Sequence, residues 1–181
     1  MNPQILNALK SSINFSAQSC ILDKLKELGH GALFLEINEH SDTFIHSLSQ
    51  ADPAIVPLFL NLGKLNSLLQ YVGKPKISKF VFKQIIFKQN GSGKNLLELA
   101  VKDICCGNNK QIVETYIDMV KDKIINPSFY INSLPGQKTT LLHEVIKNNQ
   151  IDLVARLTSA LDKNHPCMLV ADWKGQTPAE T

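Results

Sequence analysis

The chain has 181 residues, of which 44% are hydrophobic and 19% are charged, and its net charge is +3. This length fits one domain or one continuous array. The lysines are scattered singly, which argues against nucleic-acid binding, and the lack of an 18-residue apolar run argues against a membrane span. Four cysteines, two of them adjacent, make a poor disulfide framework and indicate a reducing, cytoplasmic compartment.

Helical periodicity begins at the N-terminus. Residues 3–13 and Ser19–Leu28 each place apolar side chains on one side at a spacing of about 3.6 residues, and Gly29 predicts the end of the second helix. Residues 32–50 predict two short helices with a turn near Glu39–Asp42. The N-terminal part of the chain is therefore expected to be wholly helical.

A second helical region follows Asp52-Pro53. Gly73-Lys74-Pro75 interrupts it, because proline disfavours helix at the residue before it. Ile77–Phe87 has a strand-favouring composition but helical spacing, and we favour a helix because a lone strand would have no partner. Gly91-Ser92-Gly93 then predicts a hairpin tip, and Asn95–Val101 starts another helix.

The clearest local pattern is a pair of short helices within Lys138–Leu157. Its apolar positions fall on two helical faces, the first with Leu142, Val145 and Ile146 and the second with Leu153, Val154 and Leu157. Asn148-Asn149 between them indicates a turn, because asparagine tolerates positive φ. A unit this small cannot bury its apolar face alone, so its weaker copies elsewhere predict a stacked array.

Two segments resemble the ankyrin repeat. Thr140-Leu141-Leu142-His143 is similar to the Thr-Pro-Leu-His opening of that family, and Asp172–Glu180 resembles its Asp-x-x-Gly-x-Thr-Pro-Leu-His, with Glu180 in place of histidine. Repeat starts at 56, 95, 140 and 177 are 39, 45 and 37 residues apart, longer than the family's period of about 33, which indicates degenerate repeats.

The resemblance implies an all-α, ankyrin-like helix-turn-helix solenoid with an N-terminal helical cap. The cap covers 1–52 and the repeats cover 53–181, with a faint copy at about 56–90, clearer copies at 91–134 and 135–171, and the start of a truncated copy at 172–181. The repeat positions are Leu97, Leu142, His143, Val154, Thr177 and Pro178. His143 is implied to bridge neighbouring repeats through hydrogen bonds, whereas Phe59, Glu98 and Glu180 interrupt that network.

The implied function is protein–protein recognition through hairpin tips and first helices. The chain is similar to ankyrin-repeat effectors that intracellular bacteria secrete, which implies a host protein as partner and the host cytosol as the place of action. The expected contacts are Ser92, Lys94, Gln137, Lys138, Trp173 and Lys174. Trp173 suits an interaction anchor and packing on its own preceding loop equally well.

The expected repeat start at the C-terminus suggests the N-terminal part of a longer protein, with an apolar C-terminal face that allows self-association. An alternative is the targeting or scaffolding domain of an enzyme whose catalytic domain follows residue 181. A third hypothesis is a nucleotide-dependent enzyme built on the Gly91–Lys94 loop. That loop lacks the glycine and the Ser or Thr of a phosphate-binding motif at Lys88 and Asn95.

Other chemistry is weakly indicated. His40 and His46 are six residues apart and Cys105-Cys106 has no adjacent histidine, so neither forms a tetrahedral metal set. No cysteine lies in a local sequence that would lower its thiol pKa for nucleophilic catalysis. We therefore expect no catalytic residue, metal or cofactor, and no enzyme in this chain.

Overall fold

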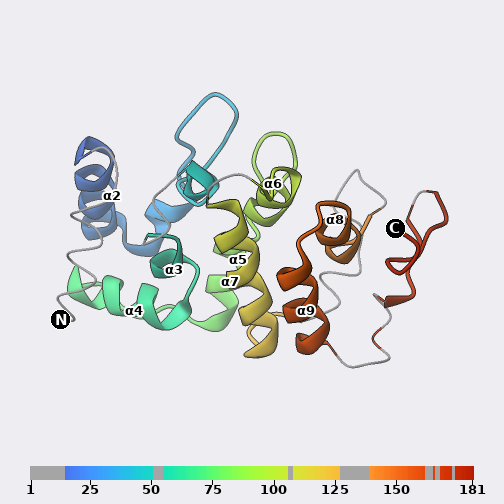
Figure 1. The fold of residues 1–181 in the computed structure, drawn as a ribbon. Coiled ribbons are helices and arrows are strands. Elements are labelled where there is room, and N and C mark those ends of the chain that lie inside the picture. Colours follow the sequence, from blue (N-terminus) through green and yellow to red (C-terminus); the bar gives the residue numbers. More distant parts are fainter. Residues whose placement is uncertain are drawn as a thin grey trace. The chain divides into compact units, whose positions relative to one another are not determined.

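A computed structural model describes residues 15–50, 55–105, 108–126, 139–161, 165, 168–172 and 174–181. Within these residues it contains eight α-helices, two 3-10 helices and no strand, and an isolated antiparallel bridge joins Glu36 to Thr43. The expected all-α class is confirmed for this part of the chain. Its contacts define two compact units, unit 1 (Met1–Leu96) and unit 2 (Leu97–Thr181), which Figure 1 shows with their helices labelled.

Unit 1 is built from helices that are joined by short connections. They are α2 (Phe15–Leu28), η1 (Gly29–Phe34), η2 (His46–Gln50), α3 (Val56–Phe59), α4 (Leu62–Tyr71) and α5 (Lys79–Ile86), and α6 (Leu96–Lys102) begins at the unit's last residue. Side-chain caps start α4 and α5, where Asn61 accepts from the N–H of Lys64 and Ser78 accepts from the N–H of Val81. Each cap satisfies an N–H group that has no partner within its helix.

Apolar side chains from these helices form the core of unit 1. The fully buried members include Leu25, Leu33, Ile45, Leu48, Phe59, Leu65, Leu69, Phe82 and Ile85. The rings of Phe44 and Phe59 meet edge to face, with centroids 4.8 Å apart. Hydrogen bonds tie the α4–α5 connection to α2 and to α4. Lys74 Nζ donates to the carbonyl of Glu27 at 2.9 Å, and the Asn66 side chain forms hydrogen bonds with the backbone of Ile77.

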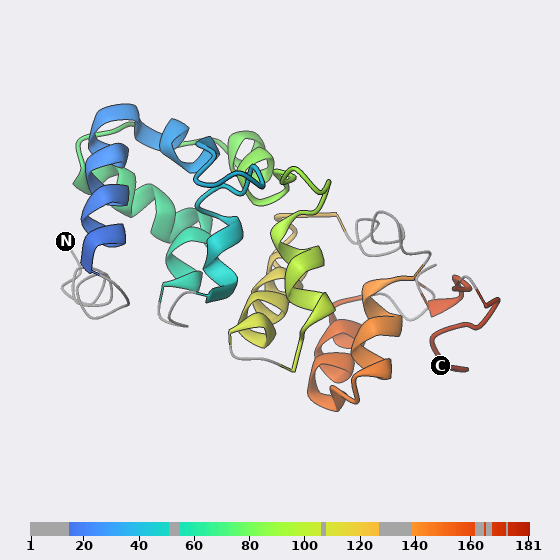
Figure 2. The ribbon, with the colours of Figure 1, turned by 90° about the horizontal axis from the view of Figure 1, so that it is seen from above.

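Unit 2 contains most of α6 with α7 (Asn109–Lys121), α8 (Leu141–Lys147) and α9 (Ile151–Ala160). Helix α9 packs against both α7 and α8, as Figure 2 shows. The core of unit 2 includes Ala100, Ile112, Tyr116, Val145, Leu153 and Leu157. Ion pairs reinforce the contact between α7 and α9, joining Lys110 to Asp152 at 2.6 Å and Arg156 to Glu114 at 3.3 Å.

Several expectations can be compared with these elements. The helix expected at Ser19–Leu28 is confirmed, although it begins at Phe15, and the helix within Ile77–Phe87 is confirmed as α5. The short helices expected within residues 32–50 are 3-10 helices, the first of which already starts at Gly29. The helix expected at residues 3–13 lies outside the described residues.

The turn between α8 and α9 is confirmed, because Asn149 has a φ of 53°. The expectation that Val154 shares the buried face of α9 is wrong in part. Leu153 and Leu157 are fully buried, whereas Val154 is only half-buried, because it lies one residue around the helix from the contact with α7 and α8. None of the described helices is long and apolar enough to cross a bilayer.

Candidate recognition loops

Three loops of the described chain share one geometry, although two lie in unit 1 and one in unit 2. We name them loop A (38–43), loop B (90–95) and loop C (172–177). Each starts with Asn or Asp, and each ends with Thr or Asn five residues later. Figure 1 shows loop A in light blue and loop B in green, both projecting from unit 1. The common spacing reflects a common set of hydrogen bonds.

In each loop, the side-chain oxygen of the first residue accepts hydrogen bonds from the backbone N–H groups two and four residues later. These acceptors and their donors are Asn38 with His40 and Asp42, Asn90 with Ser92 and Lys94, and Asp172 with Lys174 and Gln176, at distances of 2.7–3.0 Å. The carbonyl of the first residue also accepts from the N–H three residues later. The loop backbone is therefore held by its own first side chain, as in an Asx turn.

The fourth residue of each loop has positive φ. It is Ser41 in loop A at 54°, Gly93 in loop B at 71° and Gly175 in loop C at 78°. Glycine adopts this region without strain, whereas serine does so at a cost of about 1 kcal/mol or more. The recurrence of this backbone angle at one position indicates that the loop geometry, and not the residue type, is what the three segments share.

A buried histidine follows loop A and links it to loop B. The N–H of Thr43 donates to Nδ1 of His46 at 3.0 Å, and because a backbone N–H can only donate, the ring proton lies on Nε2. Nε2 then donates to the carbonyl of Lys94 at 3.2 Å, in the residue before the end of loop B. His46 is 3% exposed, so this bond joins two segments 48 residues apart through the interior of unit 1.

The same arrangement recurs in unit 2. Thr140 contacts Nδ1 of His143 through its N–H at 3.3 Å and its hydroxyl at 2.8 Å, and Nε2 lies 2.9 Å from the carbonyl of Gln176. Gln176 precedes Thr177, just as Lys94 precedes Asn95. Thr140 also caps α8 by accepting from the N–H of His143, so one threonine both starts the helix and orients the imidazole.

Three residues after the end of loops B and C the chain has a glutamate, Glu98 or Glu180. Three residues after Thr43 and Thr140 it has a histidine instead. Glu180 accepts from both the N–H and the hydroxyl of Thr177 at 2.8 Å, which lowers the pKa of its carboxyl. Glu98 occupies the equivalent position after Asn95, and the side chains of Glu98 and Asn95 are buried, whereas that of Glu180 is exposed. An ionised carboxylate has no proton to donate to a further carbonyl, whereas a neutral imidazole has one.

Loops A and B lie side by side. The N–H of Gly91 donates to the carbonyl of His40 at 2.9 Å, and the Asn90 amide donates to a carboxylate oxygen of Asp42 at 2.8 Å. A Cβ on Gly91 would lie 2.7 Å from that carbonyl oxygen, so only glycine allows this approach. The side-chain amides of Asn38 and Asn90 hold the pKa of Asp42 below its ordinary value, which keeps the carboxylate charged.

The expected contact residues have different surroundings. Ser92 and Lys174 are exposed on loops B and C, whereas Lys94 is half-buried and its backbone takes part in the His46 bridge. Gln137, Lys138 and Trp173 lie outside the described residues. Among the expected repeat positions, Leu97, Leu142 and Pro178 are buried and Thr177 is half-buried.

Loop B uses the backbone groups that a phosphate would need. The N–H of Gly91 is bonded to loop A, and the N–H groups of Ser92, Gly93 and Lys94 are bonded to Asn90. A phosphate-binding loop instead directs such groups at its ligand. In the described residues, no three His, Cys, Asp or Glu side chains gather as a metal site would require. Cys105 is exposed.

The sequence analysis predicted only a turn at loop A and did not notice that Thr43-Phe44-Ile45-His46 is similar to Thr140-Leu141-Leu142-His143. The signal was present, because Thr and His stand three residues apart there as they do at Thr140 and His143. No protein-family model, no curated protein and no solved structure gives a significant match to this chain. The internal repetition is therefore the strongest indication of what the chain does.

Proposed function

We propose that the chain is an ankyrin-like module for protein–protein recognition, in which loops A, B and C contact the partner. The observation that carries this proposal is the repeated coupling of Thr-x-x-His to a carbonyl that directly precedes the next opening. The resemblance implies such a bridge at His143, and its recurrence at His46 supports the same construction in unit 1.

Openings at 43, 95, 140 and 177 are 52, 45 and 37 residues apart. All three spacings exceed the family's period of about 33. The longest encloses η2, α3, α4 and α5, which is about one helix pair more than a two-helix repeat contains. We therefore propose that unit 1 is an ankyrin-like repeat with an inserted helix pair, and that its two loops nevertheless remain adjacent.

The loops suit recognition because they combine a fixed backbone with exposed tips. Internal hydrogen bonds restrain each loop before any partner binds, so binding orders little further backbone. The side chains of Glu39, His40 and Ser92 at the tips of loops A and B are exposed. By contrast, the residues that hold the geometry are buried or bonded within unit 1, so the tips can vary without altering the fold.

The resemblance to secreted bacterial effectors leads us to propose a host-cell protein as the partner. Site-specific photocrosslinking tests this. A photoreactive residue is placed in turn at Glu39, Ser92 and Lys174, with Gln70 on the exposed side of α4 as the matched control. After irradiation in cell extract, we expect one protein adduct at the loop positions and none at Gln70.

Binding is then measured with the purified partner by calorimetry. Ser92→Arg, which places a bulky charge on the tip of loop B, should weaken binding at least tenfold, and Gln70→Arg should leave it unchanged. Equal crosslinking at all positions, or wild-type affinity for Ser92→Arg and for the corresponding Glu39 and Lys174 variants, would contradict recognition through these loops.

A further inference from the structure

One segment of the chain carries only positive charge. Residues 53–97 contain seven lysines and neither aspartate nor glutamate. The remaining 136 residues contain the other 12 basic residues (19 − 7) and all 16 acidic ones. The individual lysines are scattered along the segment, so the feature that distinguishes it is the lack of aspartate and glutamate. This 45-residue stretch of unit 1 therefore carries seven positive charges with no acidic residue of its own to offset them.

Helix α5 presents an exposed aromatic ring within this segment. Its inner face buries Phe82, Ile85 and Ile86, whereas Phe80 on the opposite face is 69% exposed. Lys76, Lys79 and Lys83 surround Phe80 in sequence at spacings of one to four residues. We call Lys76, Lys79, Phe80 and Lys83 the α5 patch. A large apolar side chain at this exposure is not part of the core.

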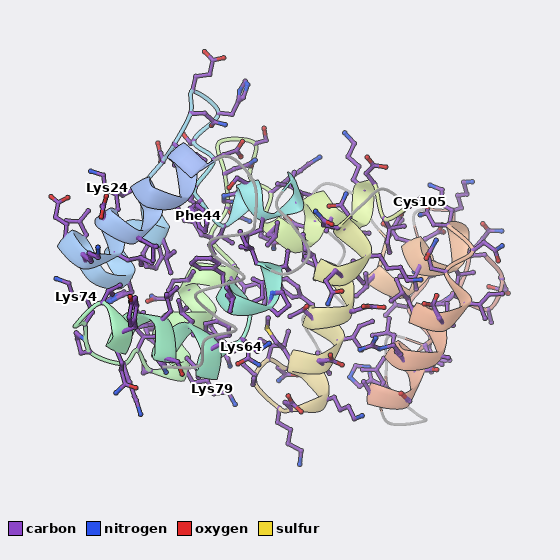
Figure 3. The ribbon with its side chains drawn as sticks, turned by 60° about the vertical axis from the view of Figure 1, so that its left-hand side comes forward. Lys24, Phe44, Lys64, Lys74, Lys79 and Cys105 are labelled. Atoms are coloured by element: carbon purple, nitrogen blue, oxygen red, sulfur yellow. The ribbon has the colours of Figure 1, made fainter. Side chains whose placement is uncertain are left out.

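The α5 patch is held in place by contacts on its other side. Asn66 in α4 accepts from the N–H of Ile77 at 2.7 Å and donates to its carbonyl at 3.2 Å, and Ser78 caps α5. Figure 3 shows Lys74 and Lys79 at the outer edge of unit 1, while Phe44 lies toward its interior. The start of α5 therefore presents the exposed side chains of Lys76, Lys79 and Phe80 from a fixed backbone, and the half-buried Lys83 follows in the last turn of the helix.

We propose that the α5 patch binds the surface of an anionic lipid membrane, with Phe80 entering the headgroup region and the lysines facing the lipid phosphates. Lysine stems can lie along apolar surface while their charges reach the headgroups. A single aromatic ring between lysines suits a diffuse negative surface, to which each lysine near it contributes about fivefold in binding. Lysine is depleted from protein interfaces, and the segment has no arginine, which bidentate recognition of a protein or nucleic-acid partner would favour.

Sedimentation of the full chain with vesicles tests this proposal. The vesicles contain phosphatidylcholine alone or with 30% phosphatidylserine. We expect binding to the anionic vesicles only, and weaker binding as the salt concentration rises. Phe80→Ala should reduce binding about fivefold, and the double variant Lys79→Gln, Lys83→Gln should reduce it at least tenfold.

Unit 2 offers matched controls. Ile151 is an exposed apolar residue at 73%, and Lys121 and Lys147 are exposed lysines. Ile151→Ala and the double variant Lys121→Gln, Lys147→Gln should therefore bind like the wild type. All variants are checked for an unchanged circular dichroism spectrum and thermal midpoint, so that a loss of binding is not a loss of folding.

Insertion of residue 80 is measured separately. Phe80→Trp in a Trp173→Phe background should show a blue-shifted emission on anionic vesicles and quenching by brominated lipid. No binding to anionic vesicles, binding that is equally sensitive to the control variants, or binding only to an acidic polypeptide or RNA would overturn the proposal. Loss of loop-mediated crosslinking would leave these vesicle results unchanged, so the two proposals can fail independently.

Discussion

Replacement of His143 by alanine should destabilise unit 2 without removing the cap of α8. The imidazole is 1% exposed and joins Thr140 to the carbonyl of Gln176. The N–H of residue 143 and the Thr140 hydroxyl, which form the cap, both remain in the variant. The substitution therefore isolates the bridge from the start of the helix.

The magnitude follows from the two ring nitrogens. Nδ1 loses its contacts with Thr140 and Nε2 loses its contact with Gln176, and a net loss of about 1 kcal/mol at each nitrogen gives about 2 kcal/mol in the free energy of unfolding. The hydroxyl of Thr140 and the carbonyl of Gln176 would lose a partner in a buried place, which adds to this loss wherever water cannot replace the ring. His40→Ala is the matched control, because the His40 side chain is 71% exposed, and it should change stability by less than about 0.5 kcal/mol.

Urea denaturation followed by circular dichroism gives the overall change, and hydrogen exchange read by mass spectrometry locates it. Because two units can unfold separately, the exchange data decide which unit is affected. We expect faster exchange in peptides from residues 139–181 and little change in those from residues 15–96. A denaturation midpoint as little altered as that of His40→Ala would refute the argument that the bridge stabilises unit 2.

Three further outcomes are expected. Gly91→Ala should separate loops A and B and speed amide exchange in both, because its Cβ would meet the backbone carbonyl of His40. Gly93→Ala should lower the free energy of unfolding by about 1 kcal/mol, because residue 93 has a φ of 71°, but it should not separate the loops; equal effects of the two variants on amide exchange would contradict the close approach. Burial lowers the pKa of His46, so unfolding free energy should fall as the pH drops below about 6.5, and His46→Gln should flatten that dependence in urea titrations at several pH values. Calorimetry should detect no ATP binding by the wild type or by Lys94→Ala, because the N–H groups of loop B are already bonded; micromolar binding lost in the variant would show otherwise.

The sign of the pH effect follows from linkage. A histidine whose folded pKa is below its unfolded value binds fewer protons in the native state, so its stabilising contribution is complete above about pH 6.5 and is lost as the pH falls toward the folded pKa. Asp42 opposes the lowering of the pKa of His46 through its negative charge, but burial has the larger effect. The carboxyl of Asp42 itself has a lowered pKa, so its contribution is lost only at more acid pH.

Helices with a strong 3.6-residue period were predictable from the sequence. Phe82, Ile85 and Ile86 share one face of α5, and that periodicity outweighed a composition typical of strands. The turn at Asn149 was predictable for a different reason, since asparagine tolerates positive φ better than most residues. In both cases the deciding interactions lie within a few residues.

The partners of His46 and His143 could not be derived in the same way, because each bond spans more than 30 residues. Loop A was predicted only as a turn, since Ser41 stands where loops B and C have glycine and so hides the shared pattern. The α5 patch is not evident from the spacing of single lysines, because it depends on the lack of acidic residues between them and on the exposure of Phe80 in the fold. Long-range pairing and charge balance over a surface are properties of the fold, which local spacing does not specify.

The central claim is that two buried histidines, His46 and His143, donate through Nε2 to the carbonyls of Lys94 and Gln176. Nitrogen-edited NMR of the imidazole side chains tests it directly. We predict slowly exchanging Nε2–H protons for His46 and His143, with nuclear Overhauser contacts to residues 94–95 and 176–177 respectively, and rapidly exchanging ring protons for the exposed His40. If Nδ1 carries the proton in either buried ring, or if both ring protons exchange as fast as that of His40, then the repeated bridge and the ankyrin-like construction proposed from it are contradicted.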